Sequence, residues 1–414
     1  MKIKAFRGLR PRPDKVKQIA CRPYDVLDSN EAREEAKDNP LSFLNVIKPE
    51  ISLAAGIDPY DQTVYEAGKN NFVRLLEQGI FSRDATDCLY IYELTMNGHT
   101  QSGIVACAWV EDYLQDRIKK HELTRPDKEE DRKKHIRTSM INAEPVFFAY
   151  RAVEELDRIM ATVKESAPVY DFCADDGIVH RFWVVEDGGV IEDITSAFER
   201  IPATYVADGH HRTAAAALVG HDLSLENPDH TGDEEYNFFL AVHFPHDQLQ
   251  IIDYNRVVKD LGGLSADAFV EKLKSSFTIE NRGMEQHGPK ALHEIAMYLD
   301  GEWYALTAKP GTFDDTDPVA VLDVTILSRQ ILEPVLDIAD LRRDKRIEFV
   351  GGIRGLGELQ RRVDSGEMAV AFAMFPVTMQ QLMDIADSGN IMPPKTTWFE
   401  PKLRSGLVVH SLEE

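Results

Sequence analysis

Hydrophobic and polar positions along the chain follow two periods, one typical of amphipathic helices and the other of strands. Residues 58–79 repeat apolar side chains at helical spacing and end at a glycine, which predicts a helix. Residues 88–110 form two β-rich runs on either side of Asn97-Gly98, a dipeptide typical of a tight hairpin turn. The first part of the chain therefore predicts both helices and antiparallel strands.

The same two patterns continue to the end of the chain. Further strands and helices are expected over residues 141–152, 167–187, 194–220 and 237–258. From about residue 264 helices alternate with strands, and no repeat or low-complexity tract interrupts them. We therefore predict a mixed α/β (α+β) fold in two parts, residues 1–261 and residues 262–414, with the boundary near residues 261–265; the alternative is that Gly262-Gly263 forms a loop within one domain.

Charge and composition exclude several classes of protein. The 414 residues carry 47 Lys and Arg against 70 Asp and Glu, a formal net charge of −23. No basic stripe offsets this charge, so a nucleic-acid partner is not expected. No uncharged apolar run reaches membrane-spanning length, and none follows the basic start of the chain, so neither a membrane span nor a signal peptide is expected. These features predict a cytoplasmic protein of undetermined oligomeric state.

The segment YVADGHHRTAAAAL places a short β-rich run directly before an alanine-rich helix. The turn between them lies at a helix N-terminus, where unpaired N–H groups and the helix dipole attract anions. Gly209 permits a tight turn, and Asp208 can cap the helix or hold a metal. His210, His211 and Arg212 add donors that suit phosphate oxygens. Alternatively, Asp208 only caps the helix and the two histidines only pack.

A second stretch, IKKHELTRPDKEEDRKKHIR, follows an expected strand. Glu122, next to His121, is a candidate general base for a substrate hydroxyl. The run over residues 128–134 is instead expected to form a solvated charged surface.

A third stretch, MPPKTTWFEPKLRSGLVVH, closes the chain with a loop stiffened by prolines. Ordering a loop that carries Lys395, Trp398 and Lys402 is entropically unfavourable, which favours a ligand or a domain contact there. The alternative is a C-terminal strand anchored by Trp398 and Phe399.

Together, CRPYDVL, KHELT, VADGHHRTAAA and MPPKTTWFEPKLRSGLVVH resemble a large microbial family, domain-of-unknown-function family 1015, over nearly the whole chain. Through ADGHHR the family is similar to the ParB/sulfiredoxin superfamily and, within it, to free-serine kinases, which phosphorylate L-serine with ADP or ATP. The resemblance implies a ParB/sulfiredoxin-like core with a mixed sheet, followed by a C-terminal α/β region. It also implies Mg²⁺, with ATP or ADP as phosphate donor and free L-serine as acceptor.

The resemblance implies a role for each matching residue. It assigns the Asp208–Arg212 turn to nucleotide phosphates, with Asp208 also on the bound Mg²⁺, and it makes Glu122 and Asp208 the catalytic residues. The implied substrate-binding residues are Tyr24, Asp25, His121, Thr124, Lys395, Trp398 and Lys402. The chain departs from the common family pattern at Cys21-Arg22 and at Leu123, where an arginine that contacts phosphate often follows the glutamate.

The sequence is also compatible with two function classes other than a kinase. A metal-dependent hydrolase would use Asp208, His210, His211, His243 and His246 as ligands, although no H-x-H or H-x-x-x-H pair supports it. A nucleotide-binding regulator of ParB type would use the anion site as a switch, although the acidic charge argues against DNA. The chain contains no G-x-x-x-x-G-K-[ST] motif, which excludes a P-loop kinase.

Overall fold

The computed structural model describes residues 1–54 and 56–413, and the chain divides into two compact units. Unit 1 comprises Met1–Leu249 together with the C-terminal segment from Pro401, and unit 2 comprises Gln250–Glu400. This division differs from the expected boundary between residues 261 and 262. The strand at residues 254–258 pairs with two strands of unit 2, which moves the boundary toward the N-terminus.

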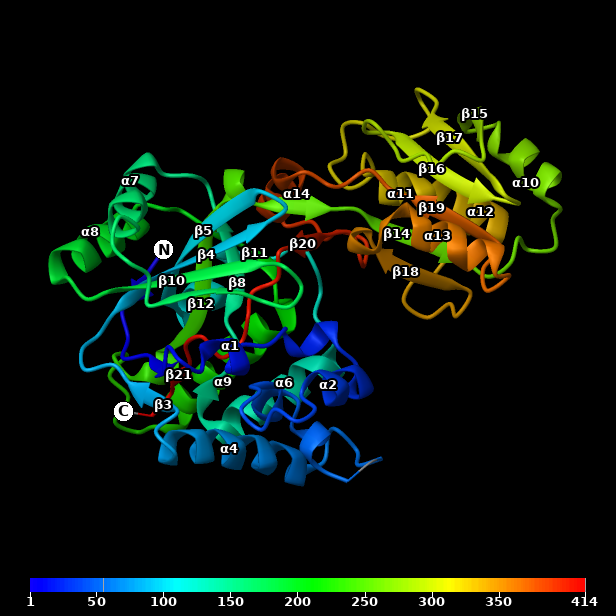
Figure 1. Cartoon of the computed structure of the whole chain (residues 1–414). Coiled ribbons are helices and arrows are strands. Elements are labelled where there is room, and N and C mark those ends of the chain that lie inside the picture. The colour runs from blue at the N-terminus through cyan, green and yellow to red at the C-terminus, as the bar shows by residue number, and fades with distance from the viewer. Residues whose placement is uncertain (55, 414) are drawn as a thin grey trace. The chain divides into compact units, whose positions relative to one another are not determined.

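Unit 1 is built on a nine-stranded mixed sheet with the order β6-β11-β8-β12-β5-β4-β10-β9, in which β1 pairs with β5 (Figure 1). Its strands are β1 (Ile3–Lys4), β4 (Leu89–Met96), β5 (His99–Trp109), β6 (Ile118–Lys119), β8 (Val146–Tyr150), β9 (Tyr170–Cys173), β10 (Val179–Val185), β11 (Thr204–Asp208) and β12 (Phe238–Pro245). The β6–β11 and β8–β12 pairs are parallel, and the others are antiparallel. β4 and β5 form the hairpin predicted at Asn97-Gly98, where both residues have positive φ.

Helices pack on this sheet around an apolar core. The helices concerned are α5 (Val110–Leu114), α7 (Glu154–Val163), α8 (Gly188–Glu199) and α9 (His210–Glu226). Ala215 and Val219 of α9 share one buried cluster with Phe148 of β8 and Phe198 of α8. The alanine-rich segment forms the helix that the sequence predicted, and its small buried side chains face the sheet. The mixed α/β fold class is confirmed.

A second core of unit 1 joins N-terminal helices to the C-terminal segment. Its short elements and helices are β2 (Leu9–Pro11), α1 (Val16–Ile19), η1 (Tyr24–Val26), α2 (Ser29–Glu35), α3 (Leu44–Ile47), η2 (Pro49–Ser52), α4 (Gln62–Glu77), β3 (Phe81–Arg83), α6 (Pro126–Ser139), β7 (Ile141–Asn142) and β21 (His410–Ser411). Phe43, Phe72 and Phe81 pack together there, and Val409 joins the same cluster. The chain end is thereby anchored in unit 1.

The charged run over residues 128–134 is helical and keeps Glu130 and Lys134 exposed, as the sequence predicted, but it is not solvated throughout. It lies in α6, which packs between α4 and α9 and buries Asp131, Arg132 and His135. Arg132 forms an ion pair with Asp131 at 2.9 Å, so the buried charges compensate each other. The prediction of a solvated surface was therefore wrong for Asp131 and Arg132, because charged side chains can be covered when they are paired with each other.

Unit 2 contains a six-stranded antiparallel sheet with the order β15-β17-β16-β19-β14-β18 (Figure 1). Its elements are β14 (Tyr254–Val258), α10 (Ala266–Leu273), β15 (Phe277–Gly283), β16 (Glu294–Leu299), β17 (Glu302–Ala308), α11 (Asp323–Leu327), the π-helix η5 (Ser328–Leu332), α12 (Glu333–Leu336), β18 (Ile347–Gly351), η6 (Gly352–Arg354), α13 (Gly355–Asp364), β19 (Val370–Ala373) and α14 (Met379–Asp387). A separate ribbon pairs β13 (Gln250–Ile252) with β20 (Trp398–Glu400). The last two short helices, η3 (Glu235–Asn237) and η4 (His246–Gln248), flank β12 in unit 1.

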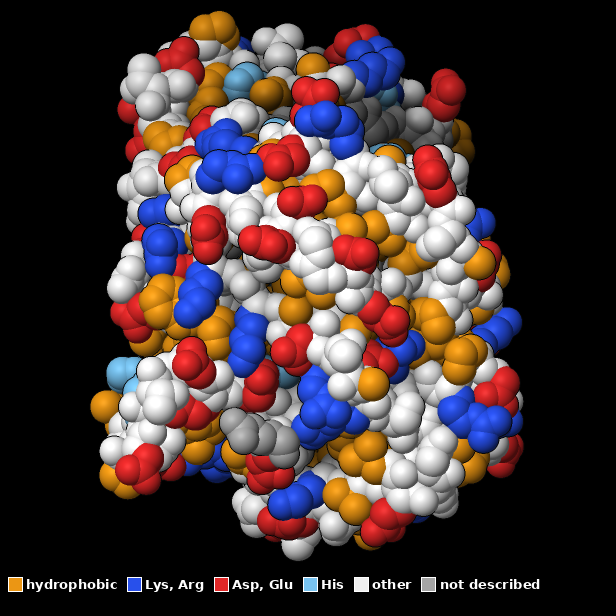
Figure 2. All heavy atoms as spheres, turned by 90° about the vertical axis from the view of Figure 1, so that its left-hand side faces the viewer, with side chains coloured by type: hydrophobic (Ala, Val, Ile, Leu, Met, Phe, Trp, Pro, Cys, Tyr) orange, Lys and Arg blue, Asp and Glu red, His pale blue; other side chains and the backbone are white. Residues whose placement is uncertain are grey.

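Acidic and basic side chains are interspersed over the face shown in Figure 2. The net charge of −23 is therefore not gathered into one acidic patch on that face. Among the helices that the structure describes, none combines the length and the apolar character that a membrane span requires.

Candidate functional site

The candidate site lies where two parallel strands end at the same edge of the unit 1 sheet. Ile118 of β6 is paired with Thr204 of β11, so the HELT bend after β6 and the Asp208–Arg212 turn after β11 come together. The imidazole rings of His121 and His210 lie 4.5 Å apart, edge to face. Two motifs that are distant in sequence therefore meet in one place.

The backbone around Asp208 is irregular in a way that aims its side chain. The register of β11 on β8 shifts between Val206 and Asp208, which leaves Ala207 as a bulge. Gly209 then takes a left-handed conformation (φ 89°) as the N-cap of α9, which has no side-chain cap. Asp208 is therefore not the cap of this helix, which differs from the alternative interpretation that Asp208 only caps it. The start of α9 therefore has the backbone N–H groups and the dipole of a helix N-terminus, which suit an anion.

Replacing Gly209 with alanine is expected to destabilise the protein by about 1–2 kcal/mol, because the left-handed conformation is unfavourable for other L-residues. The added Cβ would also lie 3.1 Å from Arg212 Nε and would displace that side chain. Urea denaturation measures the loss of stability, with Gly98→Ala as the control. Gly98 also has positive φ but has open space around its Cβ position, so an equal loss in both variants would argue against the Arg212 contact.

Asp208 lies between two cations. Its Oδ1 accepts a hydrogen bond from Lys402 Nζ at 2.9 Å, and its Oδ2 accepts one from Arg212 at 3.0 Å. Burial acts to raise the pKa of Asp208, but Lys402 and Arg212 outweigh it and lower that pKa to about 2. The carboxylate is therefore ionised at every physiological pH, and it fixes both cations beside the start of α9.

The two facing histidines of the site are neutral at neutral pH. Burial lowers the pKa of His121 to about 4, despite the opposing effect of Asp208, and it lowers the pKa of His210 well below its ordinary value. His210 is only 8% exposed, and the described residues provide no hydrogen-bond partner for its Nε2. His211 Nε2 instead accepts the backbone N–H of Arg125 at 3.0 Å. Lys402 and Arg212, which contact Asp208, therefore supply positive charge at the turn.

Arg212 also reaches a buried charged layer behind the turn. Its guanidinium donates to the carbonyl oxygen of Pro145 at 2.8 Å and lies 3.8 Å from Asp25. Burial alone would lower the pKa of Arg212, but Asp25, Glu144 and Asp208 raise it above its ordinary value. Arg212 is permanently charged and held from several sides.

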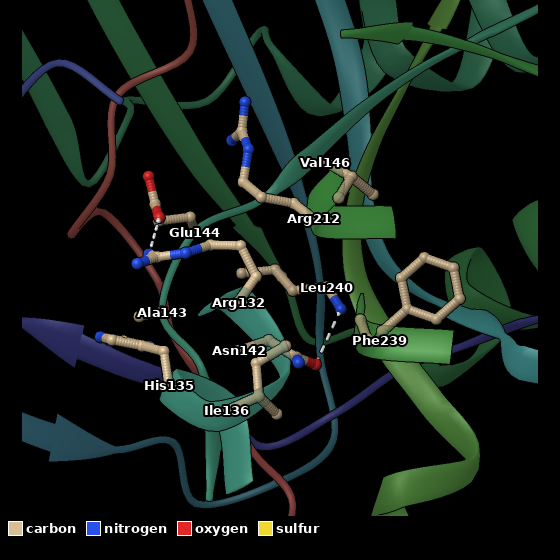
Figure 3. Close-up of a pocket in the computed structure, with 11 residues that line it drawn as sticks. Arg132, His135, Ile136, Asn142, Ala143, Glu144, Val146, Arg212, Phe239 and Leu240 are labelled. Atoms are coloured by element: carbon tan, nitrogen blue, oxygen red, sulfur yellow. Dashed lines mark hydrogen bonds and ion pairs between the residues drawn. The ribbon is translucent and has the colours of Figure 1, made fainter. Parts of the chain in front are cut away.

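Arg132 and Glu144 complete this layer, and the sequence analysis missed both. They point toward each other in Figure 3, with Arg132 Nη1 3.7 Å from Glu144 Oε2. Arg132 also lies over the ring of Tyr24, and Glu144 accepts the Tyr24 backbone N–H at 3.1 Å. A cavity of about 30 Å³ between Arg132, Glu144 and Arg212 is large enough for water only. Glu144 could have been found from the sequence, because it is the one acidic residue in the apolar segment INAEPVFF.

The predicted site residues fall into two groups. Tyr24, Asp25, His121 and Lys402 belong to unit 1 and contact the residues described above. Glu122 and Thr124 lie in the HELT bend of the same unit, and the Thr124 hydroxyl donates to Glu129 at 2.8 Å.

Lys395 and Trp398 belong to unit 2. The Lys395 ammonium lies over the ring of Tyr254, 5.8 Å from its centroid, and the Trp398 ring meets the same ring edge to face. Trp398 begins strand β20, as the alternative interpretation of the C-terminal loop expected. Both residues are therefore part of the folded framework of unit 2.

The ligand set of a metal-dependent hydrolase is not brought together. His243 pairs with Phe148 in the sheet, whereas Asp208 pairs with Phe147, so the two side chains lie on opposite faces. The His243 ring is enclosed by Phe148 and Phe198. Across residues 1–54 and 56–413, no three His, Cys, Asp or Glu side chains form a group that could hold a metal ion.

The ionised carboxylate of Asp208 is a ligand type that suits Mg²⁺. Magnesium takes hard oxygen ligands and is commonly held by one or two carboxylates together with phosphate oxygens and water. Asp208 offers one ionised carboxylate beside an anion-binding helix start, which fits a nucleotide-bound Mg²⁺. Each of its oxygens accepts one hydrogen bond from a cation in this structure and keeps a second lone pair that could bind the metal.

Comparison with known proteins gives one family and several distant structures. A conserved hypothetical protein from Pyrococcus furiosus is 16% identical, with 73% of this chain and 93% of that chain covered and a TM-score of 0.36. A free serine kinase in complex with AMP is 14% identical, with 71% and 86% covered and a TM-score of 0.35. SbnI with a C-terminal truncation, from Staphylococcus aureus, is 12% identical, with 73% and 85% covered and a TM-score of 0.36. None of the curated proteins matches this chain. The family described as "Protein of unknown function (DUF1015)" matches residues 3–325, most of the sequence, and the chain belongs to this family.

Proposed function

We propose that this protein is a phosphotransferase that moves the terminal phosphoryl group of ATP or ADP to the hydroxyl of a small substrate, free L-serine. The observation that carries the proposal is the meeting of the HELT bend and the Asp208–Arg212 turn at the ends of β6 and β11. Phosphoryl transfer needs positioned phosphates, cations that neutralise charge, and a carboxylate near the attacking hydroxyl. This edge of the sheet supplies candidates for all three.

In this proposal the start of α9 binds the phosphates. Its backbone N–H groups, Arg212 and Lys402 donate to phosphate oxygens, and His210 Nε2 is the buried polar atom that a ligand would satisfy. Asp208 holds the two cations in place before the nucleotide binds. When Mg²⁺ is bound with the nucleotide, it neutralises phosphate charge, and Asp208 is the carboxylate that would hold it.

Glu122 is proposed as the general base. The serine hydroxyl oxygen attacks the terminal phosphorus while its proton passes to the Glu122 carboxylate. The bond from that phosphorus to the bridging oxygen breaks, and ADP leaves if ATP is the donor, or AMP if ADP is the donor. Asp25, which is partly exposed and lies 3.8 Å from Arg212, is proposed to bind the substrate ammonium. Tyr24, His121 and Thr124 are proposed to shape the same pocket.

The reaction is tested directly by ³¹P NMR of the purified protein with Mg²⁺, L-serine and either ATP or ADP. We expect an O-phosphoserine resonance together with the shortened nucleotide. If L-serine is replaced by L-alanine, which has no hydroxyl, the phosphoserine resonance should be absent and nucleotide consumption should fall. Nucleotide that stays intact with either donor in the presence of L-serine would reject the kinase assignment.

A further inference from the structure

Unit 2 contains an open pocket of about 500 Å³ that the proposed reaction does not use. The loop Gly311–Asp315 lines this pocket, together with Ala320, Ile326, Arg329 and Gln330 from the segment that follows it in sequence. Pockets of this size accommodate small organic molecules. The residues around it show three local features that are rare in ordinary structural positions.

The first feature is the backbone of the helix that carries Arg329 and Gln330. The segment Ser328–Leu332 is a π-helix between α11 and α12, and such turns are found frequently at functional sites. Gln330 is held on both sides, because its Nε2 donates to the Thr312 carbonyl oxygen at 2.6 Å and its Oε1 accepts from Ser276 at 2.8 Å. The π-helix therefore fixes one wall of the pocket against the other.

The second feature is an acid and a histidine that contact the pocket lining through Phe313. Asp323 is only 4% exposed, and its Oδ1 accepts the His293 backbone N–H at 2.8 Å and lies 3.3 Å from His293 Nδ1. The described residues provide no partner for Asp323 Oδ2. His293 has a positive φ of 69°, a strained conformation for a residue other than glycine, and its ring stacks 4.5 Å from the ring of Phe313. This strained contact positions Phe313 in the pocket wall.

The third feature is the charge pattern of the pocket. Within the part of the chain that the structure describes, the exposed guanidinium of Arg329 forms no hydrogen bond or direct ion pair, and its charge acts at longer range on Asp314, whose pKa is lowered chiefly by hydrogen bonds from Thr316. Asp314 and Asp315 lie in the opposite wall, so the pocket offers one cation and two carboxylates, with apolar surface from Phe313 and Ile326 between them. A ligand that complements all of these groups carries a carboxylate, an ammonium and an apolar side chain.

We infer that this pocket of unit 2 binds a free α-amino acid with an apolar side chain, whose carboxylate pairs with Arg329 and whose ammonium pairs with Asp314 and Asp315. The matched family region ends at residue 325, so Arg329 lies beyond it. The site contains none of the residues proposed for phosphoryl transfer, and the inference does not depend on that proposal.

Isothermal titration calorimetry of the full chain with L-leucine and L-phenylalanine tests the inference. We expect saturable binding of at least one of them. Phenethylamine and 3-phenylpropionate, which each keep one of the two charges, should bind at least tenfold more weakly than L-phenylalanine. Absence of saturable binding for both amino acids, or equal binding of a single-charge analogue, would overturn the proposal.

Amino-acid substitutions in unit 2 test whether the amino acid binds in this pocket. Arg329→Ala should weaken amino-acid binding at least tenfold, and Asp315→Asn should weaken it in the same direction. Arg343→Ala is the matched control, because Arg343 also belongs to unit 2, is 89% exposed and lies outside the pocket wall. Unchanged binding in Arg329→Ala, or an equal loss in Arg343→Ala, would assign any binding to another place on the protein.

Discussion

Replacing Glu122 with glutamine is expected to lower the rate of phosphoryl transfer by about 10²- to 10⁴-fold, the usual contribution of a positioned general base. The amide keeps the shape of the side chain but cannot accept the hydroxyl proton. Because Glu122 lies in the bend after β6 and outside the apolar cores, the variant should keep its fold. Single-turnover measurement of O-phosphoserine formation is the appropriate assay, with circular dichroism to check the fold.

The matched control is Glu130→Gln, which removes the same charge from an exposed position of the adjacent helix α6. It should change the rate by less than about twofold, since a surface charge acts only through screened electrostatics. A comparable loss of rate in both variants would indicate a general effect of charge. Full activity in Glu122→Gln would remove Glu122 as the base and leave the nucleotide-binding part of the proposal intact.

Local patterns in the sequence predicted elements whose cause is local. The Asn97-Gly98 hairpin and helix α4 were confirmed because turn chemistry and apolar spacing are properties of neighbouring residues. The strand, turn and helix around Asp208 were predicted for the same reason.

Features that depend on distant pairing were not predictable in this way. Strand β6 has only two residues, yet its parallel pairing with β11 decides that the HELT bend meets Asp208. The ion pair between Lys402 and Asp208 joins residues 194 positions apart, and it follows from the return of the C-terminal segment to unit 1. Burial of Arg132 was hidden because a charged helix has the same local pattern whether its charges are solvated or paired with Asp131.

Replacing Asp208 with asparagine is expected to destabilise the protein by about 2 kcal/mol at pH 7, because Lys402 and Arg212 lose their shared carboxylate. The magnitude follows from the pKa of Asp208, which falls from an ordinary 3.8 to about 2 in the folded protein. Breaking a fully buried ion pair is worth about 3–5 kcal/mol, but the Asp208 side chain is 23% exposed, so the smaller figure applies. Asp222→Asn is the control, since this acid of the following helix α9 forms weaker pairs near 3.5 Å with Lys133 and Arg137.

The pH dependence separates this ion pair from a simple packing defect. A carboxylate with a lowered folded-state pKa stabilises the protein fully above its unfolded pKa, and this stabilisation is lost as the pH falls toward the folded value. The difference between the wild-type protein and Asp208→Asn should therefore be constant from pH 7 to pH 5 and shrink between about pH 4 and pH 2. Urea denaturation of both proteins across this range measures it. A difference that persists unchanged at pH 3 would show that Asp208 acts through packing, and the two cations would then have to be held by other groups.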